Sequence, residues 1–255
     1  MKVEIHGEQY ALADIFGGKF AFRMPRYQRP YSWEEQHAEE LLDDLLQVVL
    51  HRTGDVKDLP PYFLGTIVLV KERDDPASEV VDGQQRLTTI TLLMSALRAV
   101  LPQDASDEVT PFLYEKGSQI KGTTTHYRVM LRKVDNDFFV KRILEPGAIN
   151  QIRKLNLGDL PDSQDRLCRN AKLYLKRLET LGEEGCRCLA GYLAQRCYLV
   201  AVSTPDLESA WRIFSVLNER GMNLTHADIL KSEILGSMKE PVQSKYADLW
   251  EHAER

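Results

Sequence analysis

A β-branched, apolar stretch that turns on a glycine into a long amphipathic stretch constrains this chain more than any other feature. Residues 80–90 read VVDGQQRLTTI, in which the residues before Gly83 favour a strand and those after it favour a helix. A helix that begins there presents unpaired backbone N–H groups and the positive end of its dipole, and a glycine removes the Cβ that would keep a ligand from them. The pattern predicts an α/β core with an anion-binding turn.

Polar side chains surround that turn. Asp82 supplies a carboxylate for a divalent metal, and Arg86 a guanidinium that can fork onto a phosphate. Gln84 or Gln85 supplies an amide that can orient a water or a sugar hydroxyl. Each charged hydrogen bond of this kind contributes about 1.5–3 kcal/mol. The same spacing also fits an ordinary turn in which Asp82 caps the helix and Arg86 lies at the surface, so both interpretations stand.

The loop at residues 25–33, PRYQRPYSW, carries two prolines, two arginines and three aromatic residues. Solvated loops seldom hold so many rings, because aromatic side chains need a surface to pack on. The mixture suits stacking on a base while the arginines hold phosphate. It equally suits a rigid loop whose rings plug the core and whose arginines pair with carboxylates. Ser32 is the expected N-cap of a helix that runs to about residue 51, with Glu35 as its capping-box partner.

The remaining pattern predicts strands with inserted helices in one part, residues 1–102, and mainly helices in a second part, residues 103–255. Residues 62–70 are apolar on both faces, which predicts a central strand. Residues 103–126 are polar, which predicts a loop. Helices are expected over 135–144 and 165–181, and a strand over 198–203. A further helix should run from Leu207 and end before Gly221, and Thr225 should cap the next one. The expected class is α/β (α+β).

Basic residues gather between positions 128 and 177 of a chain whose formal net charge is −5. That acidic balance argues against a protein that coats nucleic acid by bulk electrostatics, but it permits a local basic surface. The helix over 165–181 carries Arg169, Lys172 and Lys176 on its polar side. These residues are candidates for contact with a phosphate backbone, although a solvated helix face is the more common explanation.

Targeting signals are missing from the sequence. No apolar stretch approaches the ~20 residues of a membrane span, and the N-terminus lacks the apolar core of a signal peptide. The four cysteines have no metal-ligand spacing, which favours free thiols in a reducing compartment. We therefore expect a cytoplasmic protein. The last residues, 250–255, lie inside a helical pattern, and we expect a domain of a longer protein.

Three stretches occur in the order typical of one family: residues 25–33, residues 81–89, and residues 214–224, which read FSVLNERGMNL and are followed by Asp228 and Lys231. In this order they resemble the N-terminal domain of GmrSD-type restriction enzymes, over roughly residues 10–236. The resemblance implies a ParB/sulfiredoxin-like small mixed sheet with helices, which carries the first two motifs. A mainly helical portion with the third motif follows it.

The resemblance also implies a function. Such domains bind and hydrolyse nucleoside triphosphates with Mg²⁺ or another divalent cation, and they sense modified double-stranded DNA in bacterial defence against phage. The implied partners are a nucleotide, DNA, and a C-terminal HNH nuclease domain or a partner subunit, while no membrane partner is expected and a homo-oligomer stays open. No His-Asn-His pattern is present, so this chain is not expected to be the nuclease. The alternative is a DNA-binding module that does not hydrolyse nucleotide but uses it as an allosteric switch.

Site residues follow from the resemblance, motif by motif. The implied catalytic residues are Asp82, Gln84, Gln85 and Arg86, with Asp82 also as the metal ligand. The implied nucleotide- or phosphate-binding residues are Gly83, Arg26, Gln28, Arg29, Asn218, Arg220, Asp228 and Lys231. The residues expected to contact DNA or a modified base are Tyr27, Tyr31, Trp33, Arg169, Lys172 and Lys176. A metal ligand, a water-orienting amide and a cation would meet the needs of phosphoryl transfer without the Walker A loop that the sequence lacks.

Overall fold

The computed structural model describes residues 5–52, 54–120 and 122–218, together with residues 234, 235, 238, 242, 245, 246, 249 and 250. The strands are β1 (His6–Ala11), β2 (Ala21–Arg23), β3 (Tyr62–Val70), β4 (Ala77–Asp82), β5 (Tyr114–Glu115), β6 (His126–Tyr127), β7 (Val129–Met130) and β8 (Cys197–Thr204). The α-helices are α1 (Leu12–Asp14), α2 (Glu35–Leu50), α3 (Gln84–Val100), α4 (Gln103–Val109), α5 (Lys133–Phe139), α6 (Ala148–Gln151), α7 (Asp162–Arg196) and α8 (Leu207–Asn218). Short 3₁₀ or π-helical segments lie at Ile15–Lys19, Val56–Asp58, Thr110–Phe112, Val140–Leu144 and Ile152–Lys154.

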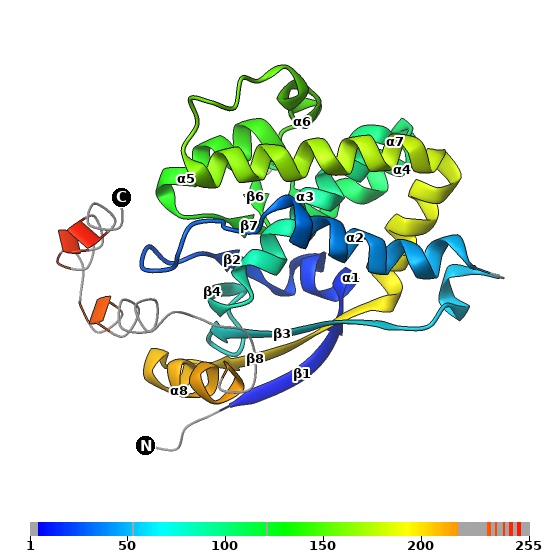
Figure 1. Ribbon diagram of the computed structural model, residues 1–255. Helices are drawn as coiled ribbons and strands as arrows, with labels where there is room; N and C mark the ends of the chain where they lie inside the picture. Colours follow the sequence, from blue (N-terminus) through cyan, green and yellow to red (C-terminus); the bar gives the residue numbers. More distant parts are fainter. Residues whose placement is uncertain are drawn as a thin grey trace.

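Six of these strands form a mixed sheet in the order β1-β8-β3-β4-β2-β7. Helices α2, α3 and α7 lie on one side of the sheet and α8 on the other (Figure 1). The alternation along β3 follows from these two layers, since Ile67 and Leu69 pack in the large core while Val68 packs in a smaller cluster under α8. The sequence prediction of a central strand, buried on both faces, is confirmed.

The sheet draws strands from the whole length of the described chain. Strand β8 lies between β1, to which it is antiparallel, and β3, to which it is parallel. Strand β7 pairs in parallel with β2. The parts before and after residue 102 therefore share one sheet, and their apolar side chains share the main core. The expected α/β (α+β) class is confirmed.

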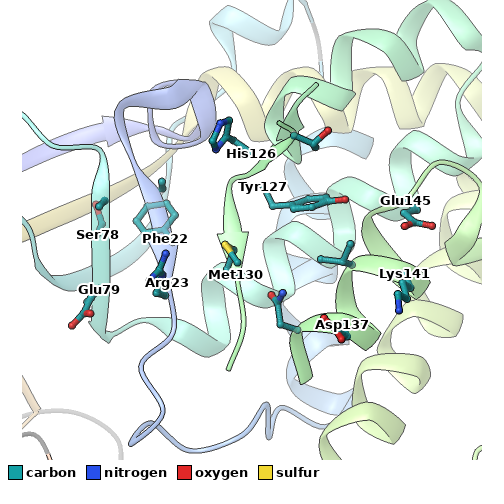
Figure 2. A pocket seen from close by; sticks show the side chains of 15 residues that line it. Phe22, Arg23, Ser78, Glu79, His126, Tyr127, Met130, Asp137, Lys141 and Glu145 are labelled. Atoms are coloured by element: carbon teal, nitrogen blue, oxygen red, sulfur yellow. The ribbon is translucent and has the colours of Figure 1, made fainter. Parts of the chain in front are cut away.

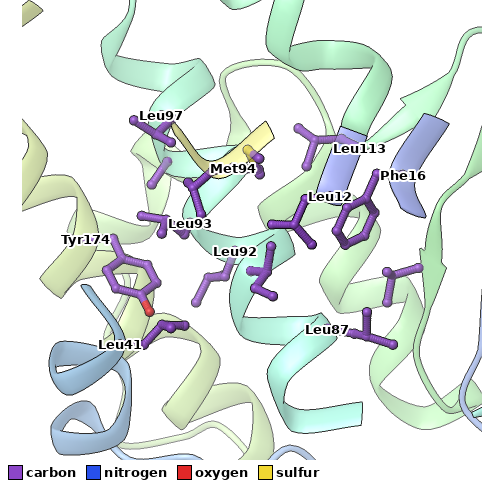
Figure 3. Packing of buried hydrophobic residues seen from close by; sticks show 14 of the residues in the cluster. Leu12, Phe16, Leu41, Leu87, Leu92, Leu93, Met94, Leu97, Leu113 and Tyr174 are labelled. Atoms are coloured by element: carbon purple, nitrogen blue, oxygen red, sulfur yellow. The ribbon is translucent and has the colours of Figure 1, made fainter. Parts of the chain in front are cut away.

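Helix α3 is the centre of that core. Helical spacing predicts one buried stripe, and its members are indeed buried: Leu87, Ile90, Met94, Leu97 and Leu101. Leu92, Leu93 and Ser95 on the other sides of the helix are buried as well. A helix that is buried all round belongs to the interior of a protein rather than to its surface, so the expectation of a single apolar face was too narrow. Figure 3 shows α3 residues such as Leu93 packed between Leu12 and Tyr174, which come from segments far apart in the sequence.

Three predictions about the secondary structure were wrong or incomplete. Helix α2 begins at Glu35 with Glu34, not Ser32, as its N-cap, and the N–H of Glu34 donates to Nδ1 of His37 at 3.3 Å. The N–H of Ser32, which a capping box would pair with Glu35, donates to Gln85 instead. The expected loop over 103–126 contains α4, a 3₁₀ turn and the β5–β6 hairpin. Helix α7 extends well beyond the predicted 165–181 and changes direction at Gly182, where φ is 75°. Gly221 and Thr225 lie outside the described residues.

Candidate anion-binding site at the start of helix α3

The predicted strand–turn–helix unit is present, with β4 ending at Asp82 and α3 starting at Gln84. Gly83 is the N-cap residue and has φ +92°. A Cβ at this position would overlap the side chain of Ile67 on β3. Gly83 therefore meets two demands at once, a left-handed backbone and a close approach to the neighbouring strand. The result is a helix N-terminus held directly beside the centre of the sheet.

Two β-bulges shape the strands next to this turn. The pairing of β4 with β3 gains one residue on β4 at Val81, immediately before Asp82. The carbonyl of Val81 accepts a hydrogen bond from Nε2 of Gln28 at 2.8 Å. The pairing of β3 with β8 gains one residue on β3 between Phe63 and Thr66. Bulges re-aim the residues that follow them, and here both lie beside the motif.

Arg86 and Asp82 face this irregular part of the sheet. Nη1 of Arg86 donates to the carbonyl of Thr66 at 3.0 Å, its one hydrogen bond among the described residues. Burial lowers the pKa of Arg86, which the carboxylate of Asp82 opposes. Burial also raises the pKa of Asp82, against the effects of the Gly83 N–H and of the guanidinium groups of Arg86 and Arg29. The turn thus holds a carboxylate and two cations in partly desolvated surroundings, where charge interactions are strong.

The two glutamines of the motif bind the loop at residues 25–33. Nε2 of Gln84 donates to the carbonyl of Arg29 at 3.0 Å, and Nε2 of Gln85 donates to that of Pro30 at 3.0 Å. Oε1 of Gln85 accepts from the N–H of Ser32 at 2.8 Å and from that of Trp33 at 3.3 Å. Both ends of the Gln85 amide are therefore committed to the loop. The predicted role in orienting a water stays a prediction, and Gln84, whose Oε1 has no partner within the described chain, suits it better.

Helix α7 secures the same loop from the other side. Nδ2 of Asn170 donates to the hydroxyl of Tyr31 at 2.8 Å and to the carbonyl of Trp33 at 3.0 Å. The Tyr31 hydroxyl also meets Oγ1 of Thr89 on α3 at 2.8 Å. Asn170 and Thr89 were not predicted as site residues from the sequence. One signal was available, since Asn170 interrupts the apolar stripe of its helix next to Ala171, and a buried amide needs partners.

Most rings of the loop are directed inward. Tyr31 is 5% exposed and Tyr27 is 4% exposed, with the Tyr27 ring centroid 5.9 Å from that of Trp211 on α8. Trp33 is partly exposed and stacks on His37 at 5.9 Å. Predicted stacking on a base would require Tyr27 and Tyr31 to leave the interior, whereas Trp33 could reach a ligand with a smaller change. Contact of these rings with DNA stays a prediction.

A small hollow lies where Arg29, Gln84 and Gln85 meet the segment after β7. Arg132 and Asp135 line it as well. They form a buried ion pair of 3.2 Å, and Oγ of Ser163 donates to Asp135 at 2.7 Å. The hollow measures about 10 Å³, room for about one water. It lies at the carboxyl ends of the parallel strands β2, β4 and β7, which is where open α/β sheets bind ligands.

The remaining predicted site residues lie elsewhere. On α7, Nε of Arg169 binds Asp165 at 2.7 Å, Nζ of Lys172 donates to the carbonyl of Leu155 at 3.3 Å, and Lys176 is exposed. These contacts favour a solvated, partly paired helix face. Arg26 is half-buried in the loop. In the third motif, Asn218 ends α8, and three predicted residues lie outside the described chain: Arg220, Asp228 and Lys231.

A larger cleft of about 550 Å³ lies over β2, β4 and β7 and contains none of the predicted site residues. Figure 2 shows Arg23 and Glu79 on its strand side, with Tyr127, Lys141 and Glu145 across from them. Its lining carries three carboxylates and two cations from Arg and Lys. This balance disfavours a polyanionic ligand, whereas the start of α3 adds a helix dipole to two arginines. The start of α3 is the better candidate for phosphate.

Comparison with known proteins gives one result for the whole domain. The family described as GmrSD restriction endonuclease, N-terminal domain, matches residues 12–235. No curated protein matches the chain. Within the described residues, no helix combines the length and the apolar character that crossing a membrane requires.

Proposed function

The chain belongs to the GmrSD restriction endonuclease N-terminal domain family, a family of restriction-enzyme domains, and from this premise we propose that it binds and hydrolyses nucleoside triphosphates. In this proposal the domain senses the modification state of double-stranded DNA in the cytoplasm. It passes that information to a nuclease domain or a partner subunit. The chain is then the regulatory part of an anti-phage restriction enzyme and not the part that cuts DNA.

The observation that carries the proposal is the arrangement at the start of α3. The backbone N–H groups of the helix start, Arg29 and Arg86 lie near Asp82, and Gly83 lets the helix start close against β3. Unpaired N–H groups at a helix start bind phosphate oxygens. A guanidinium with unused donors can follow the charge that develops on a transferring phosphoryl group. Arg86 meets this description because Thr66 occupies only one of its donors.

A divalent cation fits the same place. Mg²⁺ in nucleotide sites is usually held by one or two carboxylates together with the phosphates. The described residues contain no cluster of three or more metal-ligating side chains, so a metal here would rely on Asp82 and on the nucleotide. Bound in that way, Mg²⁺ would neutralise charge on the phosphates. Gln84 then remains to orient the attacking water.

A second candidate function is favoured by the amide of Gln85. The Gln85 amide binds the loop at residues 25–33 and not a water. In this second function, Gln85 links nucleotide binding at the start of α3 to the position of a loop that faces DNA. A nucleotide that displaced the loop would then act as a switch without being hydrolysed. The two functions share the binding site and differ in turnover.

The experiment that separates them measures phosphate release from each of the four ribonucleoside triphosphates with Mg²⁺, with and without duplex DNA, alongside equilibrium nucleotide binding. We expect turnover that falls by roughly 10²–10³-fold in Arg86→Ala, the usual effect of removing one charge-stabilising donor, and that stops on chelation of the metal. Arg153→Ala is the matched control, because Arg153 is a partly exposed arginine paired with Glu179. Tight nucleotide binding without phosphate release would support the switch. If the protein neither binds nucleotide nor releases phosphate, both functions are refuted.

A further inference from the structure

Gly65 interrupts the otherwise apolar strand β3 at the point where the strand passes the first turn of α3. It lies within the bulge between Phe63 and Thr66 and has φ +99°. A glycine inside a strand often marks a bulge or the close approach of another group. Both apply here, and the group that approaches is the guanidinium of Arg86.

The contact between Gly65 and Arg86 has a defined geometry. A Cβ built on Gly65 would lie 3.1 Å from Cζ, 3.1 Å from Nη2 and 3.2 Å from Nη1 of Arg86. Nearly equal distances to these three atoms mean that the flat face of the guanidinium, and not its edge, lies over the glycine. The N–H donors, which point outward along the edge, are left for the carbonyl of Thr66 and for a ligand.

We infer that Gly65 is a positioning residue for Arg86, and that the bulge in β3 forms the seat on which the guanidinium rests. The seat fixes the guanidinium by its face and by one hydrogen bond, so that its remaining donors can bind a ligand without further ordering. Fixing a charged group before the reaction is what makes it effective in stabilising a transition state. This inference rests on the proposed function for its consequence in turnover, but the seat itself is a property of the fold.

Two effects of a Cβ at Gly65 must be told apart. Any L-residue at φ +99° strains the backbone, whether or not Arg86 is nearby. Gly147 provides the matched control, because it also has a positive φ, +73°, while a Cβ on it would meet nothing within 4 Å. Gly147→Ala therefore reports backbone strain alone, and Gly65→Ala reports strain together with displacement of the guanidinium.

The test is a double-mutant cycle of Gly65→Ala and Arg86→Ala, with Gly147→Ala beside it, measured by thermal unfolding and by phosphate release. We expect Gly65→Ala to lower kcat about tenfold, because a displacement of a few tenths of an ångström is smaller than the ~1 Å that can cost 10²-fold. Added to Arg86→Ala, the same substitution should lower kcat no further. In unfolding, Gly65→Ala should lower Tm by an extra ~2–4 °C when Arg86 is present.

Each outcome decides the inference. Equal effects of Gly65→Ala on Tm with and without the Arg86 side chain would overturn it, as would unchanged kcat in Gly65→Ala. If Gly65→Ala does not fold, recovery of folding in the double variant supports the seat, and failure of both variants overturns it. If the unaltered protein releases no phosphate, the proposed hydrolysis fails, while the Tm cycle still decides whether Gly65 positions Arg86.

Discussion

The two ends of helix α3 each hold a desolvated arginine, and the two arginines serve different purposes. At the end of the helix, Arg98 is 6% exposed and donates to the carbonyls of Leu144 at 2.7 Å and Glu145 at 3.1 Å. Its guanidinium also lies 5.8 Å from the ring centroid of Tyr114. At the start, Arg86 has one hydrogen bond among the described residues, to Thr66. Burial lowers the pKa of both arginines.

The difference shows that burial and a lowered pKa do not by themselves mark a functional arginine. Arg98 binds the carbonyls of Leu144 and Glu145 at the end of a π-helical segment, which is a structural task. Arg86 has N–H donors that bind no described residue, and it lies beside the Asp82 carboxylate and the N-terminus of α3. Nη1 of Arg98 also has no hydrogen-bond partner among the described residues, but it is buried. The more useful criterion is therefore unused donors that lie beside a carboxylate and a helix N-terminus.

The largest effect on stability should come from Arg98. Arg98→Ala removes the donor of the buried Leu144 carbonyl and opens a void, and we expect the free energy of unfolding to fall by about 3 kcal/mol. In thermal unfolding this corresponds to a decrease in Tm of roughly 6–12 °C. Phosphate release per folded molecule should stay within about twofold of the unaltered protein. A folded Arg98→Ala protein that hydrolyses nucleotide as poorly as Arg86→Ala would break the distinction between the two ends.

The stability of the N-terminal end of α3 should depend on Gln85 more than on Gln84. Gln85→Ala leaves the N–H groups of Ser32 and Trp33 and the carbonyl of Pro30 without partners, and we expect a loss of about 2 kcal/mol in urea denaturation. Gln84→Ala removes a single contact, to Arg29, and should cost about 1 kcal/mol. Trypsin should cut the loop at residues 25–33 faster in Gln85→Ala than in Gln84→Ala. Equal losses in the two variants would mean that the loop is held mainly by α7.

A smaller, pH-dependent effect is expected from Asp82. Because burial raises its pKa, the folded protein binds this proton more tightly than the unfolded chain does. Asp82 therefore adds stability in acid, below its unfolded pKa, and that stability is lost as the pH rises through the folded pKa. Asp82→Asn should raise Tm by about 2–4 °C near pH 7, equivalent to about 1 kcal/mol, with the gain shrinking toward acid pH.

Asp206 provides a control, because its pKa is shifted in the opposite direction from that of Asp82. Hydrogen bonding at the start of α8, including the N–H groups of Ser209 and Glu208, lowers the pKa of Asp206. The stability it provides is present above its unfolded pKa and is lost as the pH falls through its folded pKa. Asp206→Asn should therefore lower Tm near pH 7 and lose this effect in acid. Parallel pH profiles for the two variants would contradict the assignment of Asp82 as a desolvated carboxylate.

Local sequence patterns were sufficient for the turn and for the central strand. Gly83 between a β-branched and an amphipathic stretch predicted the start of α3, and the apolar residues 62–70 predicted β3. Both predictions rest on neighbours in sequence, where periodicity and glycine act directly. The place of β8 between β1 and β3 could not be predicted in this way, because strand order depends on pairing between distant segments.

The side-chain partners at the site were also beyond local patterns. Gln85 binds a loop more than 50 residues earlier in the chain, and Asn170 binds the same loop from more than 130 residues later. From the sequence, Arg132 belongs to the basic stretch over 128–177 and Asp135 begins the predicted helix over 135–144, whereas the fold places both beside Gln84. Two residues gave a usable local signal, Gly65 as a glycine inside an apolar strand and Asn170 as a polar residue in an apolar helix stripe.

The smallest expected effects concern the polar face of α7. Here too, we expect an unpaired cation to matter more for ligand binding than a paired one. Lys176 is exposed and has no ion pair within the described residues, whereas Arg169 is paired with Asp165. If this face contacts a DNA backbone, Lys176→Ala should reduce the salt dependence of DNA binding by about one counterion. Arg169→Ala should reduce it less, because its partner already neutralises part of the charge. Both variants should unfold within about 0.5 kcal/mol of the unaltered protein. Unchanged salt dependence in both variants would assign this face to solvation alone, and DNA would then have to be recognised at the loop and the start of α3.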